Sequence, residues 1–223
     1  MSRQVVVSLS LLMGMGALAQ ATPTTYSGSL TSADGGLVGT GGWVGNPSTP
    51  ATFSWTITQN TDQSWHYHYV FDTTGLQGGL SHLVLETSLN LTAADILNAT
   101  PPIDGAGPAW YSAANGNPNM PEPVFGVKFS GNSSAITSFD FDCLRAPMWG
   151  DFYAKDGAKG GQLWNAGFTS SDTDPTVPAE NDSIVYHVLV PDTATSGVPA
   201  PGSISLAGVA VCLVSGLRRR RIL

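Results

Sequence analysis

The chain has 223 residues, with nine basic and sixteen acidic side chains and a formal net charge of −7. An acidic chain lacks the basic patches that nucleic acids and anionic lipids require, so we expect neither as a partner. Glycine and proline are abundant, at 26 and 15 residues, and long helical periodicity is absent. This composition favours an all-β domain of the secreted type.

Residues 1–21 have the three-part pattern of a secretory signal peptide. Arg3 supplies the single positive charge, an apolar core spans residues 5–18, and small residues follow, so we expect cleavage after Ala21. An N-terminal anchor is the less favoured alternative, because the apolar core is short and two glycines interrupt it. The pattern predicts export across the cytoplasmic membrane.

Residues 22–192 are expected to form one domain, in which apolar and polar residues alternate. Without Arg3 and the basic C-terminal end, it keeps four basic residues against sixteen acidic ones, a net charge of −12 that suits a soluble exported protein. Its length is sufficient for one hydrophobic core. Cys143 lies in this domain and Cys212 near the C-terminus, so we expect no disulfide and a buried, inert Cys143 thiol.

The alternation predicts eight or nine short strands in an antiparallel β-sandwich of the jelly-roll or immunoglobulin-like kind. The clearest pair is residues 52–58 and 64–71, which polar turn residues join into a hairpin. In residues 81–88, Leu83 and Leu85 share one face while His82, Val84 and Glu86 share the other, so this strand could be covered on both sides. The remaining strands are expected at residues 26–30, 124–130, 135–142, 149–155, 162–168 and 184–190.

The connections between these strands carry three further expectations. Glycine, asparagine and serine residues predict one hairpin between 124–130 and 135–142, and Asp156-Gly157 predicts another between 149–155 and 162–168. Thr92 and Asp95 have the spacing of a helix cap, so residues 92–97 are predicted to form one short helix. Residues 34–45 and the proline-rich residues 100–123 are expected to be loops.

The last 26 residues, 198–223, have the pattern of a sorting tail. A short apolar segment that ends in arginines is threaded into a membrane and stopped there, because the charges cannot follow and stay in the cytoplasm. The apolar transmembrane segment is expected at residues 203–217, and residues 193–197 are expected to be a polar linker. The tail's sorting motif consists of Val198, Pro199, Ala200 and Pro201 before the apolar segment and of Arg218, Arg219, Arg220 and Arg221 after it.

The order of tripeptide, apolar segment and arginine cluster resembles the PEP-CTERM sorting signal of bacterial exported proteins. The resemblance implies an exosortase-type enzyme as partner, transient attachment to the inner membrane, and delivery to the cell surface or extracellular matrix. The usual tripeptide of that family is Pro-Glu-Pro; Pro199 and Pro201 match it, whereas Ala200 stands in place of glutamate. The alternative is an ordinary C-terminal anchor that is never cut. Residues 149–157 also resemble a segment that recurs in exported proteins of this family, and that segment implies no activity.

The metal hypothesis with the most defined geometry concerns His66 and His68. They are two residues apart on a predicted strand and so share a face, and His82 lies on what could be a neighbouring strand. Three imidazoles on one sheet could hold zinc. The alternative is that His66 and His68 occupy the solvent side of their strand, opposite an aromatic row, where polar residues belong.

Acidic pairs suggest a calcium site, but no known calcium-loop spacing orders them. Asp140 and Asp142 share a strand face, and Asp151 and Asp156 border the hairpin of residues 149–168. The favoured interpretation is scattered surface acids that keep the protein soluble. We expect no cofactor, with calcium or zinc as the alternatives.

No sequence motif of a common hydrolase, phosphate-binding loop or dinucleotide-binding domain is present, so the leading function is a non-enzymatic surface or matrix protein. A carbohydrate-binding or adhesion module is the first alternative, because Trp110 and Tyr111 share a polar loop with Asn115, Asn117 and Asn119. A metal-dependent or glycoside-acting enzyme is the second, and two carboxyl groups in a cleft would be its signature. An exposed Trp110 would favour the first alternative, and a buried histidine or carboxylate cluster in a cleft would favour the second.

Overall fold

The computed structural model describes residues 24–45, 48–157, 160–170 and 173–191. This part of the chain is nearly all β, with antiparallel strands and only three short 3-10 turns. The predicted signal peptide, linker and sorting tail, with its apolar segment 203–217, lie outside the described residues. Within the described ranges no helix has the length and apolar character needed to cross a membrane.

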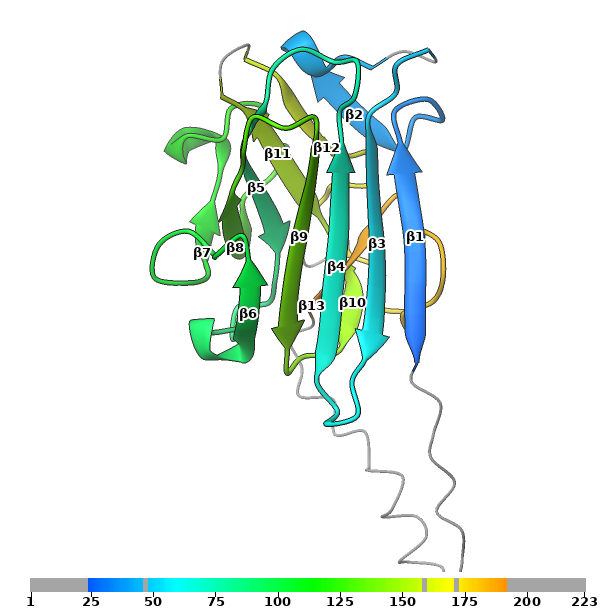
Figure 1. Cartoon of the computed structure of the whole chain (residues 1–223), viewed down its shortest axis with the longest axis vertical. Helices are drawn as coiled ribbons and strands as arrows, with labels where there is room; N and C mark the ends of the chain where they lie inside the picture. The colour runs from blue at the N-terminus through cyan, green and yellow to red at the C-terminus, as the bar shows by residue number, and fades with distance from the viewer. Residues whose placement is uncertain (1–23, 46–47, 158–159, 171–172, 192–223) are drawn as a thin grey trace, which may run out of the picture.

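The first sheet has five strands in the order β1-β3-β4-β9-β6 and faces the viewer in Figure 1. Strands β3 and β4 form the predicted hairpin, with Thr52 opposite Asp72 and Gln59 opposite Trp65. The bounds are β1 (Thr25–Thr31), β3 (Thr52–Gln59), β4 (Trp65–Asp72), β6 (Ile96–Thr100) and β9 (Ile136–Cys143).

The second sheet has six strands in the order β2-β12-β11-β5-β8-β7 and lies behind the first (Figure 1). A separate pair, β10 (Pro147–Gly150) and β13 (Val188–Pro191), lies behind β4 and β9 in this view. The bounds of the six strands are β2 (Leu37–Thr40), β5 (Leu80–Glu86), β7 (Ala109–Tyr111), β8 (Val124–Ser130), β11 (Phe152–Asp156) and β12 (Gln162–Asn165).

Aromatic rings from the two sheets meet between them and form the core. Phe53 of β3 stacks on Phe152 of β11 with ring centroids 3.9 Å apart, and Phe129 of β8 contacts Phe139 and Phe141 of β9 at 5.4 and 5.6 Å. Buried and partly exposed residues alternate along β4, as the sequence predicts. These contacts confirm an all-β fold of two packed antiparallel sheets.

Cys143 lies in this core with none of its surface exposed. Burial disfavours the charged thiolate and raises the pKa of the thiol to about 11. Since the thiolate is the reactive form, the prediction of a buried, inert cysteine is confirmed.

Several local predictions are wrong, each because tertiary pairing decides the outcome. Strands β8 and β9 belong to different sheets, so the hairpin expected between them does not form. The helix expected at residues 92–97 is only a 3-10 turn, Ala93–Asp95, because Ile96 already pairs with Cys143 in β6. The predicted cap does form locally, since the Asp95 carboxylate accepts the Thr92 N–H at 2.8 Å.

The remaining differences concern where strands begin and end. The expected loops contain the short strands β2 and β7. Asp151 separates the expected strand of residues 149–155 into β10 and β11, which lie in different sheets. The pairing of β11 with β12 confirms the hairpin at Asp156, while the closing strand begins only at Val188.

The outer face of the second sheet is apolar and is covered by the loop of residues 112–123. Val84, Val124 and Tyr153 form a second cluster there with Met120 and Phe168. Tyr153 Oη donates to the Pro118 carbonyl at 2.7 Å, and Lys155 Nζ donates to the Gly116 carbonyl at 3.0 Å. β5 is therefore covered on both sides.

The ring contact between Phe53 and Phe152 predicts a large stability loss on truncation. We expect Phe152→Ala to lower the free energy of unfolding by about 3 to 5 kcal/mol, because it leaves a cavity between the sheets. Urea denaturation measures the change. The exposed Ile136→Ala is the control and should change stability by less than about 1 kcal/mol. Similar losses from both variants would contradict the packing described here.

Candidate functional site: a buried acid and histidine cluster beside a pocket

Four ionisable side chains meet beside the end of β5, and we call them the acid–histidine cluster. Glu86 is the last residue of β5, Asp151 separates β10 from β11, Asp174 lies in the segment between β12 and β13, and His187 directly precedes β13. Asp151, His187 and Glu86 are 0, 3 and 4% exposed. Because isolated charges are expensive to bury, such a cluster requires compensating partners.

Asp151 lies at the centre of the cluster and is well supplied with donors. Its carboxylate accepts a hydrogen bond from the side-chain amide of Asn165. The amide oxygen of Asn165 in turn accepts the Phe152 N–H at 2.9 Å. The Thr169 N–H donates to the second carboxylate oxygen of Asp151 at 2.9 Å. These bonds fix the position of the carboxylate and compensate part of its lost hydration.

His187 faces two carboxylates at once. Its Nδ1 lies 2.9 Å from Asp151 Oδ1 and 3.6 Å from Asp174 Oδ1, yet it has no partner with the geometry of a hydrogen bond. Burial lowers the pKa of the imidazole, but Asp151, Asp174 and a hydrogen bond to the Gly150 backbone outweigh that effect, so the pKa of His187 is raised.

Glu86 completes the cluster as a carboxyl group that holds its proton. Oε2 accepts the Asp151 N–H at 2.9 Å, while Oε1 is buried without a hydrogen-bond partner. Burial, followed by repulsion from Asp174 and Asp151, raises the pKa of Glu86 to about 10. Burial and the Asp151 charge also raise the pKa of Asp174, to about 6.

A pocket of about 380 Å³ opens beside this cluster, and Glu86 and Asp174 line both. Phe125, Met148 and Trp149 supply apolar surface. The other lining residues are Thr87, Ser88, Leu89, Asn90, Val190 and Pro191. A preformed apolar pocket with a few converging polar groups is typical of a small-molecule binding site.

Unpartnered polar atoms concentrate in this region. In the described part of the chain six buried side-chain atoms lack a hydrogen-bond partner, and four of them belong to the cluster or to the pocket lining. They are Glu86 Oε1, Thr87 Oγ1, Trp149 Nε1 and His187 Nδ1. Since buried polar atoms in proteins are nearly always paired, this concentration marks the region as a candidate binding site.

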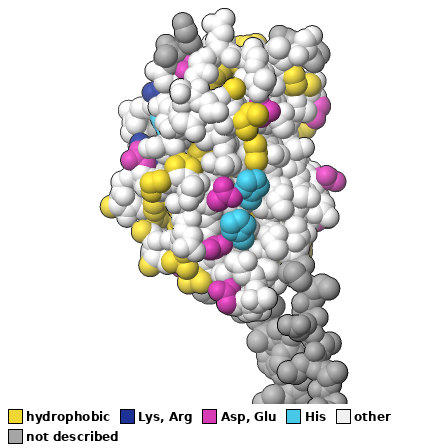
Figure 2. Space-filling view, viewed as in Figure 1, with side chains coloured by type: hydrophobic (Ala, Val, Ile, Leu, Met, Phe, Trp, Pro, Cys, Tyr) yellow, Lys and Arg dark blue, Asp and Glu magenta, His cyan; other side chains and the backbone are white. Residues whose placement is uncertain are grey.

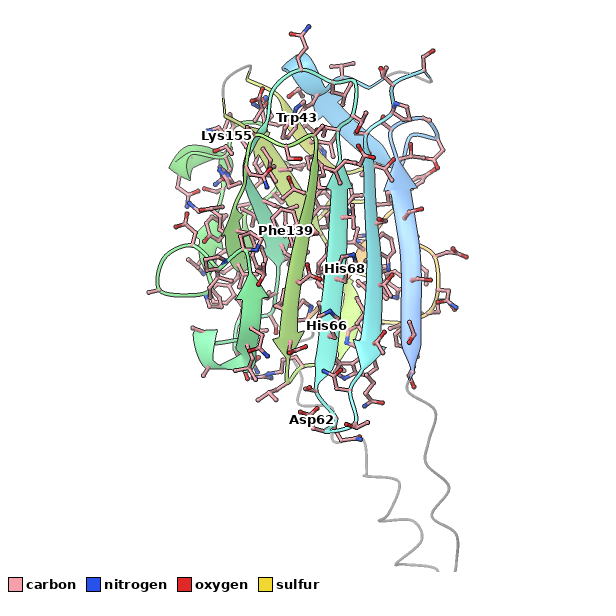
Figure 3. The ribbon with its side chains drawn as sticks, in the orientation of Figure 1. Trp43, Asp62, His66, His68, Phe139 and Lys155 are labelled. Atoms are coloured by element: carbon pink, nitrogen blue, oxygen red, sulfur yellow. The ribbon has the colours of Figure 1, made fainter. Side chains whose placement is uncertain are left out.

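The three histidines considered for zinc do not come together. His66 and His68 lie one after the other along β4 on the outer face of the first sheet (Figure 3), where acidic side chains flank them (Figure 2). His66 Nδ1 lies 2.9 Å from Asp142, and His68 bonds Asp140 on the paired strand β9. His82 lies in the second sheet and contacts Asn117 at 2.9 Å.

Trp110 and Tyr111 differ in exposure. Trp110 is 55% exposed and meets Phe125 edge to face at 5.9 Å, while Tyr111 is half-buried against the second apolar cluster. The three nearby asparagines bond within the protein: Asn115 donates to the Trp110 carbonyl, Asn117 contacts His82, and Asn119 donates to Gln162. Only the tryptophan ring remains an open surface for a ligand.

Sequence reasoning missed the acid–histidine cluster because its members are spread over a hundred positions without a recognisable spacing. The interpretation of Asp151 and Asp156 as surface acids is wrong, since they are 0 and 2% exposed. One signal was available: the alternation in β5 placed Glu86 on the same face as Val84, and a strand covered on both sides buries that carboxyl group.

Comparisons with known proteins do not identify the chain. No protein-family model, no curated protein and no solved structure matches it.

The raised pKa of Glu86 predicts that replacing this carboxyl group with a neutral amide stabilises the protein, and that the gain depends on pH. That pKa is near 10 in the fold and near 4.5 in the unfolded chain, so the free energy of unfolding falls as pH rises between these values. With a chelator present, Glu86→Gln should therefore stabilise the protein at pH 8 by about 1 to 3 kcal/mol and have little effect at pH 4.5.

Urea denaturation at the two pH values measures this difference. The matched control is Glu122→Gln at an exposed position, which should change stability equally little at both. A gain from Glu86→Gln that is the same at pH 4.5 and pH 8 would show that Glu86 ionises normally in the fold.

Proposed function

We propose that this chain is an exported, non-enzymatic protein of the cell surface or extracellular matrix whose β-sandwich binds a neutral glycan. Export and sorting are inferred from residues 1–21 and 198–223, and the proposed processing partner is an exosortase-type enzyme. The inner membrane would hold the chain only until its tail is cut.

The observation that carries the binding proposal is the aromatic surface at the pocket. Phe125 lines the pocket and meets Trp110, whose ring is 55% exposed, edge to face at 5.9 Å, whereas Trp149 lines the pocket but is only 1% exposed. Sugars stack their apolar faces on such rings, and Ser88, Asn90 and the adjoining carboxyl groups offer hydrogen-bonding atoms for hydroxyl groups. The acidic charge of the domain favours a neutral ligand over an anionic one.

The carboxyl groups at the pocket bear on the enzyme alternative. A glycosidase needs two carboxyl groups about 5 to 10 Å apart, on either side of the bond that is cut. The two that line this pocket, Glu86 and Asp174, both belong to the acid–histidine cluster, where the charge of Asp174 contributes to the raised pKa of Glu86. A metal-dependent or glycoside-acting enzyme is the alternative, and the buried acid–histidine cluster beside the pocket is the feature that favours it.

The path of the chain supports a jelly-roll sandwich over an immunoglobulin-like one. The chain passes from one large sheet to the other after β1, β2, β4, β5, β6 and β8. Repeated crossing is typical of jelly rolls, an architecture that includes lectin domains.

Glycan binding can be tested with the full chain and a panel of neutral oligosaccharides. We expect weak binding, with Kd of about 1 mM. Trp110→Ala should weaken it about fivefold, because it removes a stacking contact worth about 1 kcal/mol. Calorimetric titration is preferable to fluorescence, since the substitution removes a fluorophore. Ile136→Ala is the matched exposed control, and equal affinities for all three proteins, or no binding by any, would refute the proposal.

The sorting proposal predicts the mass of the exported protein. Intact mass spectrometry should show a start near Thr22 and an end between Pro199 and Pro201, because the apolar segment with its arginines is a transient stop and a poor permanent anchor. Ala200→Glu, which restores the usual tripeptide, should be processed at least as completely. Mature surface protein that still carries Arg221 would leave the uncut anchor as the only explanation.

A further inference from the structure

We infer that Asp151, Asp174 and His187 form a binding site for one divalent transition-metal ion. This inference is independent of glycan binding, because it concerns the buried cluster behind the pocket and requires no sugar.

The first argument is the convergence of ligand atoms. One ligand atom from each of Asp151, Asp174 and His187 lies within 4.8 Å of the other two. Nδ1 of His187 is 2.9 Å and 3.6 Å from the two carboxylate oxygens. Ligands about 2.0 to 2.2 Å from a tetrahedral zinc ion are separated by about 3.3 to 3.6 Å, so small movements would accommodate the ion.

The cluster also contains two buried polar atoms without a hydrogen bond, and one of them is the ligand atom of His187. His187 is 3% exposed, and its Nδ1 points at two carboxylates without hydrogen-bonding either. A buried imidazole nitrogen that faces two carboxylate oxygens without a hydrogen bond is placed as a metal-binding nitrogen would be. Glu86 Oε1 is likewise buried and unpartnered.

The charges of the cluster also favour a cation. The carboxyl groups of Asp151 and Asp174 both face the imidazole of His187, and Asp151 and His187 are 0 and 3% exposed. A divalent cation would balance these carboxylates and give their oxygens a strong partner. The donors to Asp151 from Asn165 and Thr169 would hold the first ligand in place.

The kind of ion follows from the ligand set. Calcium and magnesium prefer oxygen ligands alone, whereas imidazole nitrogen with carboxylate oxygen suits zinc, manganese or iron. The compact spacing of these atoms also suits a small ion better than the six to eight oxygens that calcium takes. Zinc is the practical probe because it has no redox chemistry.

The test is zinc binding by the full chain after treatment with a chelator and its removal. Equilibrium dialysis should give one zinc ion per chain, and the unfolding midpoint should rise with zinc concentration, since a ligand of the native state stabilises by mass action. Asp174→Asn should weaken zinc binding by about tenfold or more. His187→Gln should do the same, and either variant suffices if the other fails to fold.

Two controls separate a built site from surface binding. The double variant His66→Gln with His68→Gln removes the exposed imidazoles and should keep the full zinc effect. Glu122→Gln, which removes an exposed carboxyl group outside the cluster, should likewise keep the full zinc effect. The inference is overturned if zinc does not bind stoichiometrically, or if binding is lost in the double variant and unchanged in Asp174→Asn.

Discussion

The second sheet has two apolar faces, and this constraint determines how the rest of the domain is built. Its inner face packs on the first sheet through contacts such as Phe53 on Phe152. Its outer face presents Val84, Val124 and Tyr153, which cannot be left in water without losing much of the hydrophobic stabilisation. Irregular loops with their own polar groups have to cover it. The Pro118 and Gly116 carbonyls are satisfied there by side chains of the sheet.

Covering the middle of that face removes water from ionisable side chains there as well as from apolar ones. Glu86 follows Val84 by two positions on β5 and is buried for the same geometric reason. Asp151 is buried beside it, and the covering segment between β12 and β13 supplies the Thr169 N–H and the carboxyl group of Asp174. The cluster thus costs stability that the surrounding apolar contacts offset. Carboxyl groups with strongly shifted pKa values are concentrated at functional sites, so their presence beside a pocket indicates a function.

Period-two alternation is a local signal, and this explains what the sequence could and could not predict. The alternation predicts strands β3, β4 and β8 and the burial of Cys143 correctly, because each of these depends only on which residues face the core. It could not tell that β8 and β9 lie in different sheets, since the Gly-Asn-Ser-Ser linker is compatible with either path. The acid–histidine cluster could not be predicted from this local signal for a related reason. Its members become neighbours only through the pairing of β5 with β11 and the return of the chain at β13.

The molecule carries two arrangements of histidine and aspartate that differ chiefly in their access to water. On the first sheet, His66 and His68 bond Asp142 and Asp140 across paired strands, where solvent is close and the Nδ1 atom of each ring has a carboxylate partner. In the buried cluster the same residue types lie at similar distances, but Nδ1 of His187 is left without a hydrogen bond and low polarity strengthens every uncompensated charge. Residue type and spacing alone therefore favour His66 and His68 as the metal site, which is the prediction that the sequence supports. Burial and an unpartnered nitrogen favour the acid–histidine cluster as the metal site. A bound ion there would compensate buried charges, whereas water already compensates the exposed charges at the surface.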